Sequence, residues 1–266
     1  MKPDISIITI SNNMLPLLLK SLHSIFLTSK NINIEIFVVD NASTDYTGEV
    51  VSVKYPQIKI IRNKKRKGFA SNNNACIKRA KGKYILLLNP DTELLPSALK
   101  NIISFMDTYK NVGVCAPQLL NPDRTLQYSC RHFPTWKTFF IRRTPLRYIF
   151  PSTAINDFHL MKNENHNKTQ KVDWVLGGCM CIRKKMIDLV GYLDERFYLY
   201  VEDIDYCLRV WHAGWKVCYV PTARVIHHHQ ARSDKKLFSI YSWHHMQSVI
   251  RFTLKHGMFL KRVMCN

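Results

Sequence analysis

The chain has 266 residues, and its 39 Lys and Arg residues outnumber its 19 Asp and Glu residues, so the formal net charge is +20 at pH 7. Hydrophobic residues make up 46% of the sequence. This fraction excludes a disordered basic tail and predicts one large or two small folded domains. The charge favours an anionic partner, and nucleic acid, a membrane surface and a phosphorylated small molecule all fit it.

Strand-like and helix-like segments alternate through the first half of the chain. The patterns predict, in order, strand 5–10, helix 15–27, strand 35–39, strand 58–61, helix 72–80 and strand 84–88. Such alternation is typical of a mostly parallel sheet covered by helices. We therefore expect an α/β fold.

The second half of the chain is less regular. Its patterns predict strand 174–182, helix 202–211, and strands 217–220 and 224–227. Apolar and basic residues interleave over 241–262, as in a basic amphipathic helix, which either lies on an anionic bilayer or packs on the rest of the protein. We predict a catalytic domain over 1–235 and a C-terminal helical appendage over 236–266.

Cysteine usage and apolar runs indicate the compartment. Eight cysteines lack the paired CxxC spacing of zinc ribbons, so we expect reduced thiols. The apolar runs are far shorter than the ~20 residues that cross a bilayer. The start of the sequence shows no signal-peptide pattern. These features predict a cytoplasmic protein that is soluble or peripheral on the inner face of the cytoplasmic membrane.

Carboxylates follow two of the predicted strands at the point where each strand ends. Asp40 and Asp45 lie in a polar turn after strand 35–39, and Asp91 follows strand 84–88. Because ligands bind at the carboxyl ends of strands in open α/β sheets, these three residues are candidates for one crevice. The turn suits a nucleobase and ribose, or it is an Asx-rich turn that caps the next helix. Asp91 suits a hard cation that bridges two phosphates.

A third acidic group begins the helix predicted over 202–211. Glu202, Asp203 and Asp205 place three carboxylates within four residues. Acidic side chains are favoured at a helix N-terminus because of the helix dipole. A carboxylate crowded by two others near apolar walls can also have its pKa raised enough to act as a general base.

Taken in order, these segments resemble the family 2 glycosyltransferases, and within them the rhamnosyltransferase-like branch that builds bacterial surface polysaccharides. The matching segments run from Ser6 to about Ser233 and lie at 6–13 (SIITISNN), 38–45 (VVDNASTD), 68–91, 174–215 and 225–233 (VIHHHQARS). The resemblance implies a GT-A fold, which is a Rossmann-like nucleotide-binding mixed sheet flanked by helices. It also implies a nucleoside-diphosphate sugar donor, a divalent cation (Mg²⁺ or Mn²⁺) and inversion at the anomeric carbon.

The resemblance also implies roles for particular residues. Asp40 looks like the contact to the base, and the other residues implied to line the nucleotide-sugar site are Thr9, Asn13, Asp45, Asn89 and Asp91. The sequence Asn89-Pro90-Asp91 is similar to the metal-binding DxD of the family and keeps only its last carboxylate.

The metal and catalytic roles come from the later segments. A metal-binding histidine is implied in the run 227–229, where counting back from Ser233 favours His228 and the strand exit allows His227. Asp203 looks like the catalytic base, with Glu202 as the alternative. Gly177 and Gly178 resemble a small-residue turn that lets the backbone approach donor and acceptor.

The sequence departs from the family pattern at two places. Asn12 stands where the family usually has an aromatic residue that stacks on the base. The basic run 64–67 stands where relatives commonly carry asparagine, and it either touches the pyrophosphate or is solvated.

The expected activity is transfer of a sugar, rhamnose as the first choice, from a dTDP- or UDP-sugar to a hydroxyl of a glycan or lipid-diphosphate-linked acceptor. Aromatic and basic residues over 131–150 fit such an acceptor, and the basic C-terminal segment fits an anionic membrane surface. The alternative is a metal-dependent sugar-phosphate nucleotidyltransferase. Nucleic acid is disfavoured as a partner, because no recognition motif is present and the acids cluster at strand ends.

Overall fold

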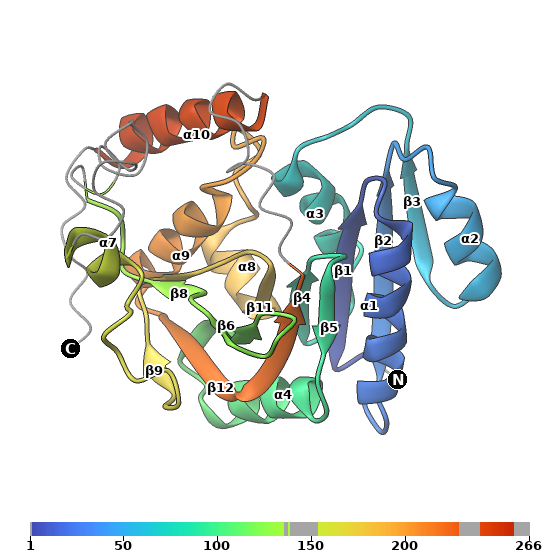
Figure 1. The fold of residues 1–266 in the computed structure, drawn as a ribbon, viewed down its shortest axis with the longest axis horizontal. Helices are drawn as coiled ribbons and strands as arrows, with labels where there is room; N and C mark the ends of the chain where they lie inside the picture. Colours follow the sequence, from blue (N-terminus) through green and yellow to red (C-terminus); the bar gives the residue numbers. More distant parts are fainter. Residues whose placement is uncertain (1, 136–137, 139–153, 229–239, 258–266) are drawn as a thin grey trace.

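The computed structural model describes residues 2–135, 138, 154–228 and 240–257 (Figure 1). The first half contains β1 (Ile5–Ser11), α1 (Leu15–Thr28), β2 (Ile34–Asn41), α2 (Thr47–Lys54), β3 (Lys59–Asn63), α3 (Phe69–Ile77), β4 (Tyr84–Leu88), β5 (Thr92–Leu94), α4 (Ala98–Thr108) and β6 (Val112–Leu120). The remaining described elements are β7 (Leu126–Gln127), β8 (Cys130–Arg131), α7 (Ala154–His159), β9 (Gln170–Lys171), β10 (Trp174–Val175), β11 (Cys179–Arg183), α8 (Lys184–Val190), α9 (Glu202–His212), β12 (Lys216–His227) and α10 (Ile240–His256).

Ten described strands form one mixed sheet. Its order is β3-β2-β1-β4-β11-β6-β12-β5, with β7 paired to β6 and β9 paired to β12. The strands β1 to β4 run parallel, whereas β11 is antiparallel to both β4 and β6. The predicted α/β fold is confirmed, and the parallel half is the part whose strand and helix pattern was regular in the sequence.

Two predicted strands have different limits in the structure. The single strand predicted over 174–182 is divided into β10 and β11 by a turn that contains Gly177 and Gly178. The two strands predicted over 217–220 and 224–227 are one long strand, β12, with a register irregularity between Val220 and Arg224. The mostly apolar sequence over 174–182 does not show that the strand is interrupted by this turn.

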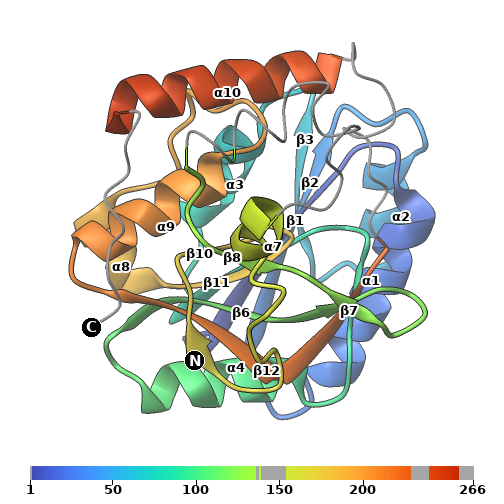
Figure 2. The ribbon, with the colours of Figure 1, turned by 60° about the vertical axis from the view of Figure 1, so that its left-hand side comes forward.

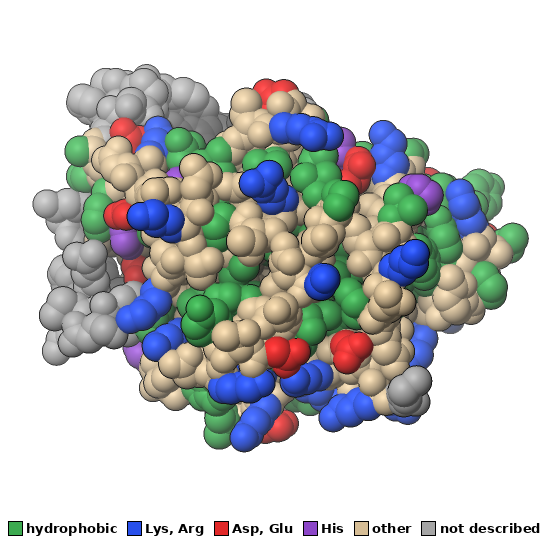
Figure 3. Space-filling view, turned by 90° about the horizontal axis from the view of Figure 1, so that it is seen from below, with side chains coloured by type: hydrophobic (Ala, Val, Ile, Leu, Met, Phe, Trp, Pro, Cys, Tyr) green, Lys and Arg blue, Asp and Glu red, His purple; other side chains and the backbone are tan. Residues whose placement is uncertain are grey.

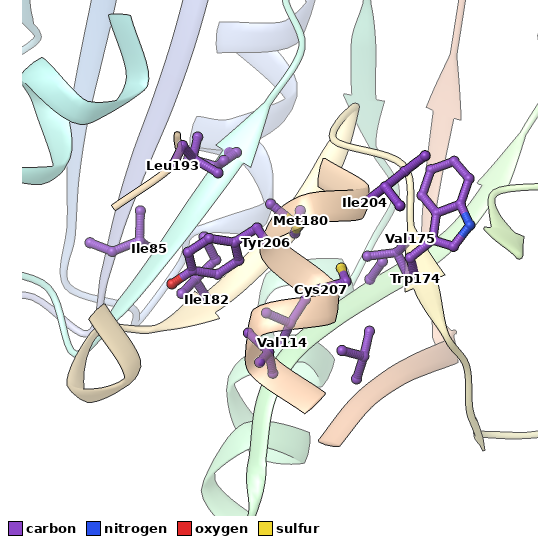
Figure 4. Packing of buried hydrophobic residues seen from close by; sticks show 14 of the residues in the cluster. Ile85, Val114, Trp174, Val175, Met180, Ile182, Leu193, Ile204, Tyr206 and Cys207 are labelled. Carbon is purple, nitrogen blue, oxygen red and sulfur yellow. The ribbon is translucent and has the colours of Figure 1, made fainter. Parts of the chain in front are cut away.

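Helices cover both faces of the sheet, and each interface has its own buried cluster. On one face Leu18 of α1 and Ile102 of α4 pack against the sheet with 0% exposure. On the other face, part of which is drawn in Figure 4, α3, α8 and α9 pack on the strands, and Cys207 of α9 lies near Val175 and Met180. Because both faces of the central strands are buried, those strands are apolar runs without alternation.

The C-terminal helix α10 crosses the protein at one edge of the sheet (Figures 1 and 2). Its Phe252 is 1% exposed and belongs to the same buried cluster as α9. Among the described helices, none combines the length and the apolar character that a bilayer span requires. The predicted domain boundary at 235 falls in 229–239, outside the described residues.

Candidate active site

The carboxyl ends of β1, β2 and β4 meet at one edge of the sheet. The pairing of Ile8 with Leu87 and of Ser11 with Asp40 aligns these ends. The polar residues that follow the strands are therefore brought to one place, as the strand order predicts.

The loop after β2 is held by the carboxylates that the sequence singles out. Asp40 is 8% exposed, and its Oδ1 and Oδ2 accept hydrogen bonds from the amides of Ser43 (2.9 Å) and Gly48 (3.2 Å). A Cβ at Gly48 would lie 2.8 Å from Asp40 Oδ2, so only glycine fits beside this carboxylate. Each oxygen of Asp40 keeps a further lone pair for a ligand.

Asp45 has a structural task in this loop. Its Oδ2 accepts the amide of Leu15 at 3.0 Å, and its Oδ1 accepts the hydroxyl of Thr47 at 2.5 Å. Burial raises the pKa of Asp45, but these hydrogen bonds outweigh it, and the pKa is held below its ordinary value. Asp45 Oδ1 also accepts the amide of Thr47, the first residue of α2, at 3.2 Å, so the carboxylate bonds the start of the next helix, as in the capping alternative that the sequence left open for this turn. Its bond to Leu15 fixes the start of α1 as well.

Asn13, Asn12 and Thr9 line the same region from β1. Asn13 lies in the left-handed region (φ 53°), and its Oδ1 accepts the amide of Thr44 at 2.7 Å. Asn12 donates its side-chain amide to the carbonyls of Asn41 (2.9 Å) and Ala42 (3.2 Å), so it ties two loops together where an aromatic residue was expected from the family. Thr9 is fully buried in β1.

Asp91 and His227 face each other beyond the end of β4. Asp91 Oδ1 lies 3.4 Å from His227 Nε2, and the two residues are 7% and 4% exposed. The other ring nitrogen, His227 Nδ1, lies 2.7 Å from Gln127 Oε1. The contact with Gln127 orients the ring so that Nε2 faces the Asp91 carboxylate. A proton on the imidazole, or a cation bound between the two side chains, makes this buried contact favourable.

His228, which the count from Ser233 favoured, points elsewhere. Its Nε2 lies 2.6 Å from Glu93 Oε1, and only its backbone amide contacts Asp91, at the carbonyl oxygen (2.8 Å). Consecutive side chains of a strand point to opposite sides, so His227 and His228 cannot share one site. Of these two histidines, His227 is the one whose ring faces Asp91. His229 lies outside the described residues.

The Gly177-Gly178 turn joins this pair to the acidic start of α9. A Cβ at Gly178 would lie 3.4 Å from Asn89 Nδ2 and 3.5 Å from the His227 ring, and the Gly178 carbonyl accepts the Asn89 amide at 2.9 Å. The Gly177 amide donates to Asp203 Oδ2 at 3.0 Å. The structure thus brings Asn89, Asp91, His227 and Asp203 around one small-residue turn.

Glu202 and Asp203 occupy different environments at the start of α9. Glu202 is 5% exposed and its Oε2 has no hydrogen-bond partner among the described residues, so burial, followed by the charge of Asp203, raises its pKa well above the ordinary value. Asp203 is partly buried. Burial raises the pKa of Asp203 too, although the amides of Gly177 and Ile204 and the charge of Arg131 oppose the rise.

The backbone that precedes this pair is strained. Tyr200 and Val201 have φ values of 65° and 74°, and a β-branched residue very rarely adopts such a value. Strain of this kind persists only where surrounding contacts fix the conformation, and it is commonly found at functional sites. The contacts here come largely from α10, because Ser248 donates to the Leu199 carbonyl at 3.0 Å and His245 stacks on Tyr200.

Two residues near the site carried no recognised role in the sequence. Gln127 orients His227, and nothing in its sequence context marks it. Arg131 was noted only within the aromatic and basic segment, whereas the structure places its charge close enough to lower the pKa of Asp203 and its guanidinium 5.4 Å from the Trp174 ring. The pairing of β8 with β10, which sets Arg131 opposite Trp174, explains this position.

The basic run 64–67 is solvated at its side chains. All four side chains are exposed. The backbone of Lys67 is nevertheless fixed, since its amide and carbonyl both bond the side chain of Asn41. Most of the segment 131–150, which was expected to meet the acceptor, lies outside the described residues.

Comparison with known sequences identifies the family. The profile of the family described as "Glycosyl transferase family 2" matches residues 6–188. The chain is 30% identical over 210 residues to "Rhamnosyltransferase WbbL" of Escherichia coli strain K12, covering 75% of this chain and 73% of that protein. It is 24% identical over 237 residues to "N-acetylglucosaminyl-diphospho-decaprenol L-rhamnosyltransferase" of Mycobacterium tuberculosis strain H37Rv, covering 84% of this chain and 76% of that protein.

The fold comparison agrees. The structure is similar to the mannosyltransferase PcManGT from Pyrobaculum calidifontis, solved with GDP-Man and Mn²⁺, with a TM-score of 0.60 and 14% identity over 99% of this chain and 78% of that one. The predicted GT-A architecture and the similarity to rhamnosyltransferases are both confirmed. The chain has an acidic helix start and an Asp91–His227 pair at one edge of the sheet, and most of it matches the family profile. The chain therefore belongs to glycosyl transferase family 2 and is a glycosyltransferase.

Proposed function

We propose that the enzyme transfers rhamnose from a dTDP- or UDP-sugar, with inversion, to a hydroxyl of a lipid-diphosphate-linked glycan in the synthesis of a bacterial surface polysaccharide. The observation that carries the proposal is the Gly177-Gly178 turn, which holds Asp203 on one side and adjoins His227 on the other. The activities named for two relatives, a decaprenol-linked N-acetylglucosamine rhamnosyltransferase and a rhamnosyltransferase, support the choice of sugar and acceptor.

In this proposal Asp203 is the general base. It removes the proton of the acceptor hydroxyl as that oxygen attacks C1 of the sugar, on the face opposite the departing nucleoside diphosphate. Asp203 is partly exposed and can meet the acceptor, whereas Glu202 is 5% exposed, and burial raises its pKa well above the ordinary value, which favours Asp203 over Glu202 as the base. General-base assistance contributes roughly 10²–10⁴-fold to such reactions.

Asp91 and His227 fit a divalent cation. Their facing atoms are 3.4 Å apart, which allows both to be adjacent ligands of one ion at metal–ligand distances of about 2.1 Å. No group of three or more His, Cys, Asp and Glu side chains within the described part of the chain could hold an ion alone. The donor diphosphate therefore completes the ligand set. When bound, the cation offsets the negative charge that develops on the leaving phosphate.

The donor nucleotide is proposed to bind over the ends of β1 and β2. Asp40 contacts the base, and Thr9 and Asn13 line the site beside it. Asp45 contributes by shaping the loop, because its oxygens already accept bonds from Leu15 and Thr47. Asn89 lies against Gly178, where the sugar and its diphosphate would approach His227.

The place of action follows from the substrates. Nucleotide sugars are water-soluble donors and a lipid-linked acceptor is confined to a bilayer, so we propose that the enzyme works in the cytoplasm at the inner face of the cytoplasmic membrane. Nucleotidyl transfer, the other activity considered, is not favoured by the family match.

The product tests the function. Incubation with dTDP-rhamnose, Mn²⁺ and a lipid-diphosphate-linked N-acetylglucosamine should release dTDP and elongate the acceptor, because glycosyl transfer breaks the bond between C1 and the diphosphate. Release of pyrophosphate would instead show nucleotidyl transfer. If transfer occurs only from a different nucleotide sugar, the enzyme is still a glycosyltransferase, but rhamnose is not the sugar that it transfers.

The base assignment has its own test. Asp203→Asn should lower kcat by about 10²–10⁴-fold while donor binding, measured by calorimetry, is retained. Turnover close to wild type in this variant, together with a large loss in Glu202→Gln, would transfer the role to Glu202.

A further inference from the structure

The helix α10 has two faces, and one is bound to the catalytic domain. Phe252 is buried on it, and Ser248 donates to the carbonyl of Leu199 at 3.0 Å. Lys255 Nζ lies 2.8 Å from Asp194 and 2.6 Å from Asp205. These contacts fix how the helix is rotated about its axis, so its opposite face has a defined orientation.

The opposite face is an exposed apolar stripe. Its members are Ile240, Trp243, Met246, Ile250 and Leu254, each more than half exposed, with Leu254 at 81%. Spacings of three and four residues place these side chains along one side of a helix. Five of the thirteen large hydrophobic side chains that the described chain exposes lie on this helix. A contiguous apolar surface of this kind usually marks an interaction site.

The segment of sequence that carries the stripe is basic. Residues 235–266 contain no Asp or Glu, and they contain six Lys and Arg residues, namely Lys235, Lys236, Arg251, Lys255, Lys261 and Arg262. The rest of the chain carries nineteen acids. An apolar helix face in a segment whose charged residues are all basic is complementary to an anionic lipid surface, where each Lys or Arg near the surface contributes about 1 kcal/mol.

The helix α10 also lies on the side of the molecule toward which the strands of the site run. Both ribbon views place α10 at the end toward which β1 and β2 run, where Asp40 lies at the end of β2 and Asp91 follows β4 (Figures 1 and 2). A bilayer that covered this edge would present a lipid-linked hydroxyl near Asp203.

We propose that the outer face of α10 docks on a bilayer that contains anionic lipids. The five apolar side chains enter the interfacial region, with Trp243 at the level of the headgroups. Lys255 is already paired with Asp194 and Asp205, so the attraction to lipid phosphates comes from the other basic residues of the segment. The purpose of docking, delivery of a lipid-linked acceptor, rests on the proposed function, whereas the docking itself rests on the helix alone.

The test is sedimentation of the full-length protein with vesicles. Wild type should bind vesicles of phosphatidylcholine with phosphatidylglycerol more strongly than vesicles of phosphatidylcholine alone, and added salt should weaken the difference. The double variant Ile250→Ser with Leu254→Ser should lower the partition coefficient by roughly tenfold or more, because two large side chains no longer leave water.

The matched control changes two equally exposed side chains elsewhere. Val53 and Leu27 are 84% and 68% exposed on α2 and α1, and Val53→Ser with Leu27→Ser should leave vesicle binding unchanged. Equal binding by wild type and the α10 double variant, or no binding by wild type, overturns the proposal. Conversion of a wild-type dimer to a monomer by the α10 variant, seen by analytical ultracentrifugation without vesicle binding, shows a second copy as the occupant and also overturns it.

A water-soluble acceptor analogue separates docking from catalysis. The α10 double variant should transfer sugar to the short-chain analogue at the wild-type rate and should be slower only on acceptor embedded in vesicles. If no transfer occurs with either acceptor while wild type still binds anionic vesicles, the proposed function fails and docking stands. If transfer is intact and vesicle binding is absent, docking fails and the function stands.

Discussion

Arg131 is the charged residue whose effect on Asp203 can be measured directly. Its positive charge lowers the pKa of the Asp203 carboxyl, which burial raises. A base works only when deprotonated, so kcat/KM rises with pH through this pKa and falls on the acid side. Arg131→Met removes this charge, so the pKa of Asp203 should rise. The acid limb of the kcat/KM profile should therefore move to higher pH, and kcat/KM should reach its plateau only at high pH.

Two further variants make the Arg131 measurement specific. Arg131→Lys keeps the charge, so its acid limb should lie at the wild-type pH. Arg124→Met removes an exposed charge outside the site and should leave the acid limb at the wild-type pH as well. An acid limb that stays in place in Arg131→Met would show that Asp203 does not control it.

His227 and its neighbour His228 offer a matched pair of substitutions. His227→Ala should abolish the enhancement of donor binding by Mn²⁺, because its Nε2 faces Asp91, whereas His228→Ala should leave that enhancement unchanged, because its ring bonds Glu93. Gln127→Ala should weaken Mn²⁺-dependent binding by about 10–100-fold, as loss of a partner that orients a ligand commonly does. Calorimetric titration with and without Mn²⁺ measures all three. A stronger effect in His228→Ala than in His227→Ala would contradict the assignment.

At the scale of elements, α10 braces the turn that carries the acidic pair. The strained residues Tyr200 and Val201 lie between contacts of α10 with Leu199 and with Asp205. Asp205 is fully buried and also bonds Arg209 and His256, so it ties the first turn of α9 to the end of α10. The sequence suggested capping or general-base roles for this acid, and the structure shows it as a joint between two helices.

Lys255→Met should destabilise the fold by about 1–3 kcal/mol, because it removes a charged partner from the buried Asp205 carboxylate and from Asp194. The control Lys110→Met removes an exposed pair with Asp107 and should change the free energy of unfolding by less than about 0.5 kcal/mol. Urea unfolding measures both. Equal, small effects would show that the brace carries little energy.

The same brace should weaken in acid. The bond from Arg196, followed by that from Lys255, holds the pKa of Asp194 well below its ordinary value. A lowered pKa in the folded state contributes stability above the ordinary pKa of about 3.9, and that stability is lost as the pH falls. In Lys255→Met the acid-dependent part of the unfolding free energy should therefore be smaller, and urea unfolding between pH 7 and the acid range, about pH 3, measures it. An unchanged pH dependence would contradict the role of Lys255.

The sequence predicted the elements better than it predicted what individual side chains do. Strand 84–88 was recognised from a continuous apolar run and helix 202–211 from apolar periodicity, because both patterns reflect burial and are local properties of the sequence. The choice between His227 and His228, the capping task of Asp45 and the position of Arg131 depend on pairings between distant strands. Those pairings are tertiary contacts, and they cannot be predicted from the local pattern of a single sequence.

At the scale of the whole molecule, the positive charge is not confined to the site. Figure 3 shows Lys and Arg side chains spread over the face seen from below, with few acidic ones among them. The acids instead contribute to the proposed site and to buried joints such as Asp205. The concentration of basic residues in the C-terminal segment is therefore part of a general excess, and what distinguishes that segment is its lack of acids.

The cysteines should be inert in the native protein. All seven described cysteines are buried, and burial raises the pKa of Cys76 and of Cys130 to about 12. Thiolates are the reactive form, so the seven described cysteines should react slowly with a thiol reagent before denaturation, and the titration should reach the full count of eight in denaturant. Cys265→Ser removes the cysteine outside the described residues. Fast reaction of this variant in native buffer would contradict the burial.

The antiparallel strand β11 has a consequence for how the protein is made. It lies between β4 and β6 in the centre of the sheet, yet it is formed by residues 179–183. During synthesis β4 and β6 are complete long before β11 emerges from the ribosome, so each has an unpaired edge in the meantime. Exposed apolar edges of this kind pair readily with other chains. Nascent chains that end before residue 183 should therefore be prone to aggregation, and chaperones would act by covering the unpaired edges of β4 and β6 until β11 is synthesised.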